Sequence, residues 1–181
     1  MSRLSIPTRD AAPAAAQPLL DAVEKQLGIV PNLFKLVALS PAALTGMLGL
    51  SGGLSKALDV KTRERIALAV AQINGCDYCL SAHTYLGLNL AKLDAAEVAA
   101  NRRGTSNDPR ADAAVRFAAK VTKSRGQVED GDLAAVRLAG FTDAQIIEIV
   151  AVVAENVLTN LINNVAQTEI DFPVARATEA A

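Results

Sequence analysis

Apolar residues recur along most of this chain at intervals of three or four positions, and glycine, proline or asparagine separates one apolar segment from the next. Such spacing is typical of helices with one buried face. It predicts helices over residues 18–27, 33–39, 41–56, 61–74, 76–90, 95–103, 109–125, 130–139 and 143–168. We find no alternating pattern typical of strands and no internal repeat, so we predict an all-α fold.

Residues at the helix ends sharpen these boundaries. We expect capping boxes at the starts of two helices, formed by Asp94 with Glu97 and by Thr142 with Gln145. The last predicted helix, residues 143–168, is the longest and is apolar over most of its circumference. A helix of that kind is buried on most sides, so we expect it to be central.

The length and composition predict a single domain that associates with copies of itself. We expect one domain over residues 1–181, with an extended N-terminal arm over residues 1–17 and a C-terminal tail over residues 169–181. Hydrophobic residues make up 51% of the chain and aromatic residues only 3%, so the core is built from small aliphatic side chains. A mean hydropathy of +0.24 is high for a soluble monomer and indicates an apolar face buried between subunits.

Charge and hydropathy exclude several other partners. A net charge of −1 argues against binding to nucleic acid or to an anionic membrane, since both need a basic surface. The uncharged run over residues 36–55 contains Pro41 and four glycines, which make it too interrupted to span a bilayer. Residues 1–18 lack the apolar stretch of a secretory signal, so we expect a cytoplasmic protein.

The only two cysteines and the only histidine fall within eight residues, at Cys76, Cys79 and His83. In a reducing cytosol a Cys-x-x-Cys pair is more often catalytic or metal-binding than a structural disulfide. At a helix start this spacing places the two sulfurs within disulfide reach, and the helix N-terminus favours the thiolate. His83 lies four residues beyond Cys79 on the same helix face. These residues predict a redox-active dithiol with a nearby base.

Glu64 joins this group if Asn74 and Gly75 reverse the chain into an antiparallel helix pair. Residue 64 then lies opposite roughly residue 85, which puts Glu64 beside His83. At ~1.5 Å per residue, the carboxylate is about 9 Å along the axis from Cys79. Glu64 can therefore orient the imidazole, and the imidazole can exchange a proton with the thiol.

Each of these residues also has a purely structural interpretation. The cysteines and His83 can be core residues, and Glu64 is in a first helical turn, where any acid is favoured. Tyr78 is expected to pack, with its hydroxyl at a polar edge, and it can instead line a pocket or an interface, as can Asn156 and Asn160. A strip of amides on the last helix is expected to be a hydrogen-bonded seam, although some of its members can instead line a substrate pocket; it comprises Asn156, Asn160, Asn163, Asn164 and Gln167.

Glu64 followed by the Cys76-x-x-Cys79-x-x-x-His83 motif resembles the alkylhydroperoxidase-D family, which is grouped with the carboxymuconolactone decarboxylases. Residues 30–35 and 160–173 are similar to the longer, peroxidase-related branch, so the resemblance spans most of the chain. It implies a helical bundle with the CxxC at the start of a central helix, assembled into trimers or hexamers. It also implies reduction of hydroperoxides without a bound cofactor or metal, with electrons from a dithiol reductant that the sequence does not identify.

By the same resemblance, Cys79 attacks the peroxide, Cys76 resolves the sulfenic acid, and Glu64 with His83 relays the proton. One position departs from the pattern. The best-known peroxidase member has a second histidine between its cysteines, where this chain has Tyr78. The proton relay can therefore be poorer, and the activity modest or directed at another substrate.

Three other classes of function remain open. A lyase of the carboxymuconolactone decarboxylase type needs cations to bind carboxylates and has no use for a CxxC pair. A structural zinc site needs four ligands, whereas Cys76, Cys79 and His83 supply three. A redox-sensing protein would use the same dithiol without turnover.

Overall fold

The chain folds into nine helices within residues 2–178, the part that this computed structural model describes, and no strand occurs there. The outer ends of the predicted arm and tail, residue 1 and residues 179–181, lie outside the described residues. The helices are α1 (Gln17–Leu27), α2 (Asn32–Val37), α3 (Pro41–Leu54), α4 (Val60–Ile73), α5 (Asp77–Asn89), α6 (Ala95–Arg102), α7 (Pro109–Ser124), α8 (Asp130–Leu138) and α9 (Asp143–Ala166). The prediction of an all-α fold is confirmed, with boundaries within two residues of most of those expected.

Two predicted capping boxes and the predicted end of α9 can be compared with the structure, and one of the three predictions is met. Thr142 forms the predicted capping box at the start of α9. The same helix ends at Ala166 and not at residue 168, because Gln167 adopts a left-handed conformation with φ of 48°. The capping box predicted at Asp94 is only half made: Asp94 accepts the backbone N–H of Glu97. The Glu97 carboxylate turns inward, where it pairs with Arg65 at 2.7 Å.

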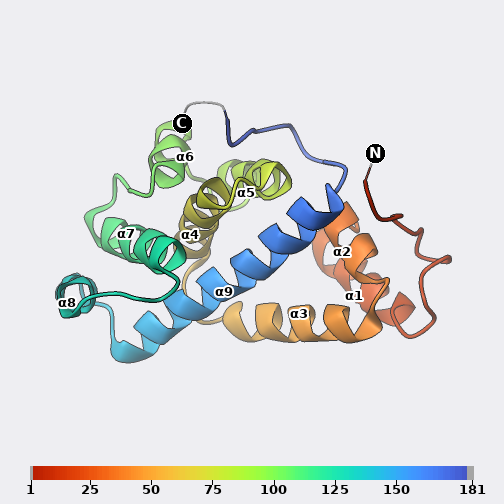
Figure 1. The fold of residues 1–181 in the computed structure, drawn as a ribbon, viewed down its shortest axis with the longest axis horizontal. Coiled ribbons are helices and arrows are strands. Elements are labelled where there is room, and N and C mark those ends of the chain that lie inside the picture. The colour runs from red at the N-terminus through yellow and green to blue at the C-terminus, as the bar shows by residue number, and fades with distance from the viewer. Residues whose placement is uncertain (1, 179–181) are drawn as a thin grey trace.

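Helix α4 is the centre of the bundle. It packs against α5, α6, α7 and α9, and residues 66–71 are buried without interruption. Three of those six residues are alanine, whose small side chains let neighbouring helices approach from every side. Figure 1 shows α9 running diagonally beneath α4 and α5, with α1, α2 and α3 at one end of the molecule and α7 and α8 at the other.

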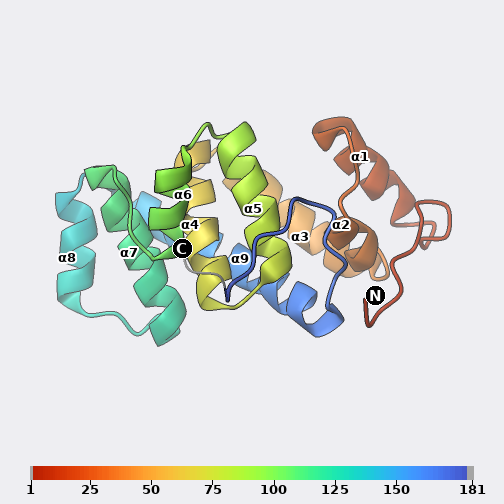
Figure 2. The same ribbon diagram turned by 90° about the horizontal axis from the view of Figure 1, so that it is seen from above.

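The C-terminal segment, residues 167–178, returns from the end of α9 across α5 (Figure 2). Backbone and side-chain hydrogen bonds fix it there. The N–H of Ala175 donates to Ser81 Oγ at 3.0 Å, and the N–H of Ala177 donates to Asp77 Oδ1 at 2.8 Å. This segment therefore covers the helix that begins with the two cysteines.

Within the described range, α9 is the one helix long and apolar enough to cross a bilayer by length and composition. It packs against α3, α4, α5 and α7 and buries the amides of Asn156, Asn160 and Asn163. Those contacts lie on one side of α9, and the central position that we predicted for it is occupied by α4.

The outer face of α9 carries exposed aliphatic side chains along its whole length, at Ile147, Leu158, Leu161 and Val165. Their spacing of eleven, three and four residues keeps them on one side of the helix. Exposed apolar stripes of this kind mark protein–protein contacts. The predicted homo-oligomer of three or six subunits remains a prediction, and this stripe is where we expect its interface.

Substituting Leu161, which is 57% exposed, with glutamate is expected to reduce the assembly to monomers, because each interface would then bury a charge. Light scattering at micromolar concentration measures the mass. Leu138→Glu is the matched control, since Leu138 is 91% exposed but lies on α8. A monomeric wild type would contradict the assembly itself, and an unchanged Leu161→Glu oligomer would exclude α9 as its interface.

Candidate active site

The two cysteines lie where the chain reverses between α4 and α5. Gly75 has φ of 62°, a left-handed conformation that glycine adopts without steric cost, and the turn leads directly into α5. Cys76 is the N-cap residue of α5, and its Sγ accepts the backbone N–H of Cys79 at 3.2 Å. The two residues are joined by a disulfide, with Cα atoms 5.3 Å apart.

Asparagines of α9 hold this turn in place. Asn74 Nδ2 donates to Asn160 Oδ1, and Asn164 Nδ2 donates to the carbonyl oxygen of Asn74, both at 2.9 Å. Asn160 is fully buried. These two members of the amide strip therefore have the structural role that we expected of the strip as a whole.

His83 and Glu64 meet as the helix-pair register predicts. His83 Nδ1 and Glu64 Oε2 are 2.9 Å apart, and both side chains are largely buried. Burial lowers the pKa of His83, but the negative charge and hydrogen bond of Glu64 outweigh it. Glu155 and Asn156 act in the same direction, so the pKa of His83 is raised above its ordinary value. The imidazole is held in place and biased towards its protonated form.

A groove of about 520 Å³ brings these groups to one wall. Cys79, His83 and Glu64 all line it, whereas Cys76 does not and is fully buried. The rest of the lining is mostly apolar and comes from several elements, including Leu27, Phe34, Leu54, Ala67, Tyr85, Leu86, Val152 and Phe172. The groove can therefore present an apolar molecule to Cys79 while the acid–base pair stays within the same space.

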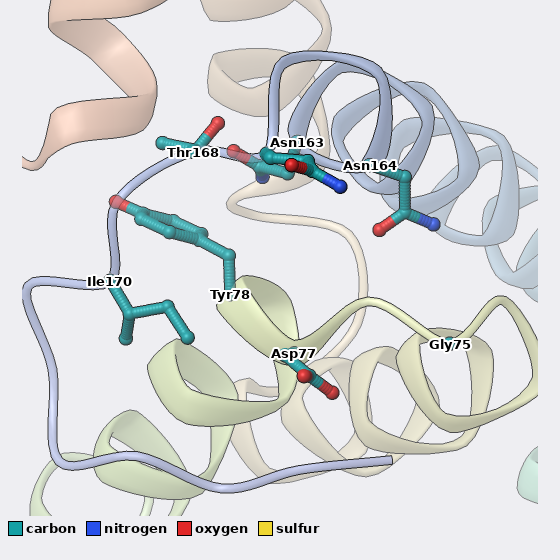
Figure 3. A pocket seen from close by; sticks show the side chains of 8 residues that line it. Gly75, Asp77, Tyr78, Asn163, Asn164, Thr168 and Ile170 are labelled. Carbon is teal, nitrogen blue, oxygen red and sulfur yellow. The ribbon is translucent and has the colours of Figure 1, made fainter. Parts of the chain in front are cut away.

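A second, smaller cavity of about 420 Å³ adjoins the start of α5 (Figure 3). Its lining is mostly polar and comprises Gly75, Asp77, Tyr78, Asn163, Asn164, Gln167, Thr168 and Ile170. Tyr78 and Asn163 line both cavities. Asn156 lines only the groove and Asn160 lines neither cavity, whereas Asn164 both lines the smaller cavity and holds the turn.

Comparisons with known proteins place this geometry in a family. Residues 41–120 match the carboxymuconolactone decarboxylase family, and this range contains Glu64, both cysteines and His83. The alkylhydroperoxidase AhpD core of a peroxidase-related protein from Ralstonia eutropha has a TM-score of 0.83 at 27% identity, covering 94% of this chain and 92% of that one. The family match and the structural likeness both support the predicted resemblance to the alkylhydroperoxidase-D and carboxymuconolactone decarboxylase superfamily.

Other solved structures share this fold. A peroxidase-related protein from Silicibacter sp. has a TM-score of 0.79 at 28% identity, covering 93% of this chain and 91% of that one. The debrominase Bmp8 has a TM-score of 0.75 at 21% identity, covering 94% and 91%. A cysteine-to-alanine variant of Bmp8 has also been solved in complex with 2,3,4-tribromopyrrole. No curated protein sequence matches the chain.

Tyr78, which stands between the two cysteines, packs as expected and also lines both cavities. Its hydroxyl accepts the backbone N–H of Leu33 at 3.1 Å, and its ring meets Phe172 edge-on at a centroid distance of 5.9 Å. Burial raises the pKa of Tyr78 far above its ordinary value, so the phenol stays protonated near neutral pH. Among the described groove residues, His83 is the one whose pKa is shifted from near neutrality by its contacts, chiefly with Glu64.

Tyr78→Phe is accordingly expected to change peroxide turnover less than about three-fold, because the residue takes no part in proton transfer. It should lower the free energy of unfolding by about 1 kcal/mol through the lost hydrogen bond to Leu33. Steady-state kinetics and urea unfolding measure the two effects. A ten-fold loss of turnover would instead give the phenol a direct role.

Two contributors to the site were not singled out from the sequence. Asn163 Nδ2 lies 3.4 Å from Cys79 Sγ, and Glu155 raises the pKa of His83. Asn163 belonged to the amide strip, but nothing in the spacing distinguished it from its neighbours. Glu155 is next to Asn156 on α9 and carried no separate signal.

Proposed function

We propose that the protein is a thiol-dependent peroxidase that reduces hydroperoxides through a Cys76/Cys79 dithiol–disulfide cycle, with Glu64 and His83 as the proton relay and no bound cofactor. The observation that carries this proposal is the shared wall of the groove, where Cys79, His83 and Glu64 lie together. The peroxidase-related proteins of the same fold support it.

The reaction uses each of these groups once. The Cys79 thiolate attacks the terminal oxygen of the hydroperoxide, so that the S–O bond forms and the O–O bond breaks. Sulfur supplies two electrons, and the leaving alkoxide takes a proton from His83, which Glu64 orients. Cys76 then attacks the sulfenic sulfur, water leaves, and the disulfide forms. An external dithiol, oxidised in turn to a disulfide, restores both thiols; a reducing compartment such as the cytoplasm would supply it.

Accessibility supports giving the attack to Cys79. Cys79 lines the groove and is 3% exposed, whereas Cys76 is fully buried, does not line the groove and serves as the helix N-cap. A peroxide entering the groove meets Cys79 first, and Cys76 is already within disulfide reach of it. Cys76 therefore suits the resolving role.

The groove does not favour the lyase alternative. Among its described lining residues, Arg63 and His83 carry the only basic side chains. Arg63 Nη1 already donates to three backbone carbonyls, those of Leu54, Ser55 and Leu58. His83 is paired with Glu64. A substrate rich in carboxylates would find little compensation for its charge there.

Thiol titration tests the proposal directly. Fully reduced protein should contain two reactive thiols and none after one equivalent of an organic hydroperoxide. With a dithiol reductant in excess, peroxide should then be consumed over many turnovers, which separates an enzyme from a redox sensor. 2,3,4-Tribromopyrrole, tested in parallel, distinguishes peroxide reduction from debromination of the kind named for Bmp8. Two free thiols after peroxide treatment would refute the redox cycle.

A further inference from the structure

The two sulfurs receive hydrogen bonds from different sources. Cys76 Sγ, at the N-cap, accepts a free N–H group of the first turn of α5, namely that of Cys79. This is the stabilisation that a helix N-terminus gives to a thiolate. Cys79 lies within the helix, and its own N–H is used by the other cysteine. The Cys79 thiolate would therefore be stabilised by a donor from elsewhere in the fold.

Asn163 supplies that donor from α9. Its Nδ2 donates to Cys79 Sγ at 3.4 Å, and the side chain is only 2% exposed. It comes from a residue 84 positions away in the sequence. A donor held in a water-excluded site stabilises a developing charge more than water does, because it needs no reorganisation.

The other half of the same amide has no partner. Asn163 Oδ1 is buried and has no hydrogen-bond partner within residues 2–178. Asn163 lines both the groove and the smaller cavity, where Figure 3 shows it beside Asn164. A buried acceptor without a partner is unfavourable, and a bound O–H group would satisfy it.

We propose that Asn163 is a catalytic residue: its Nδ2 stabilises the Cys79 thiolate, and its Oδ1 accepts the hydrogen bond of the hydroperoxide O–H. This inference rests on the proposed peroxidase function. As the S–O bond forms and the O–O bond breaks, two electrons pass from sulfur to the peroxide. The terminal oxygen keeps its hydrogen and becomes the sulfenic acid, still held by Oδ1, while the alkoxide takes its proton from His83. The amide thus orients the oxygen that is transferred and not the one that leaves.

The pH dependence of Cys79 alkylation by iodoacetamide tests the donor without requiring any peroxidase activity. In a Cys76→Ser background, Asn163→Leu should move the midpoint of the alkylation profile upward by about one pH unit or more. Asn163→Ala removes the same donor and gives the same test if the larger side chain prevents folding. In the two-cysteine protein, either change should lower peroxide turnover about ten-fold or more.

The matched control is Asn164→Ala, because Asn164 is the next residue on α9, is exposed and donates, among the described residues, to the Asn74 carbonyl. It should leave the alkylation midpoint in place. The titratable groups that share the groove with Cys79 stay unchanged in all of these variants, so the shift reports on the amide; they are Arg63, Glu64, Tyr78, His83, Tyr85 and Glu155.

An unchanged midpoint in the folded Asn163 variants overturns the role of Asn163, whether or not the wild type consumes peroxide. A wild type that consumes no peroxide, with the midpoint shifted as expected in Asn163→Leu, overturns the proposed function and with it the contact of Oδ1 with a hydroperoxide. A shifted midpoint together with lower turnover in Asn163→Leu, and neither effect in Asn164→Ala, supports both halves of the proposal.

Discussion

Cys79→Ser is expected to abolish peroxide consumption, and Cys76→Ser to stop the cycle after one turnover with a sulfenic acid on Cys79. A serine hydroxyl is not ionised at neutral pH and cannot donate two electrons to the peroxide. Without Cys76, nothing within disulfide reach can displace the hydroxyl from the oxidised sulfur. Because an external dithiol can itself reduce a sulfenic acid, Cys76→Ser is assayed without reductant, where peroxide consumption should stop at one equivalent, and Cys79→Ser with excess dithiol. Mass spectrometry after trapping with a 1,3-diketone locates the sulfenic acid.

Cys79→Ser and Cys76→Ser serve as controls for one another, because each variant removes one cysteine and leaves the other in an unchanged turn. A sulfenic acid on Cys76 in the Cys79→Ser variant would reverse the assignment of the two roles. That result would also mean that peroxide reaches a sulfur that is fully buried and does not line the groove. The groove would then not be the route of entry.

Glu64→Gln and His83→Gln are each expected to lower turnover by at least ten-fold, in line with the ~10²–10⁴-fold typical of general acid–base catalysis. The 2.9 Å contact between the two side chains makes them one unit. The double variant should therefore be scarcely slower than either single variant, because groups acting together are not additive. Independent, multiplicative losses would show two separate roles. All three variants should still fold and still form the disulfide under a strong oxidant.

The pH profile provides a sharper test of the same pair. Turnover needs the Cys79 thiolate, which forms as the pH rises, and protonated His83, which is lost as the pH rises through its pKa. Glu64 raises that pKa, so it extends activity to higher pH. Removing its charge in Glu64→Gln should move the alkaline limb of the profile to lower pH. Glu155→Gln should move it in the same direction by less, because Glu155 contributes only a charge. An alkaline limb that stays in place in Glu64→Gln would remove His83 as the proton donor.

Much of the site could be predicted from the sequence because it depends on local rules. The spacing of Cys76 and Cys79 fixes their separation within one helical turn. The Gly75 turn fixes the register of α4 against α5, and that register alone brings Glu64 to His83. Capping residues and the apolar repeat located the helices for the same reason: each signal acts over a few residues of the chain.

Local rules did not determine which contacts individual side chains make. Asp94 and Glu97 have the spacing of a capping box, yet the Glu97 carboxylate pairs with Arg65 across α4 and α6. The sequence showed that the amides of the strip share one face of α9, but nothing in it distinguished one amide from another. Asn160 became a turn anchor and Asn163 a partner of Cys79 because of where the α4–α5 turn meets α9.

The sequence by itself determined the helices, the dithiol and the Glu64–His83 pair. Only the tertiary structure decided that Cys79 faces a groove while Cys76 does not, that Phe172 of the C-terminal segment packs on Tyr78, and that α9 places an amide beside the reactive sulfur. The physical reason is distance along the chain. Helical periodicity fixes which residues share a face, whereas contacts between segments more than 80 residues apart depend on how whole helices pack.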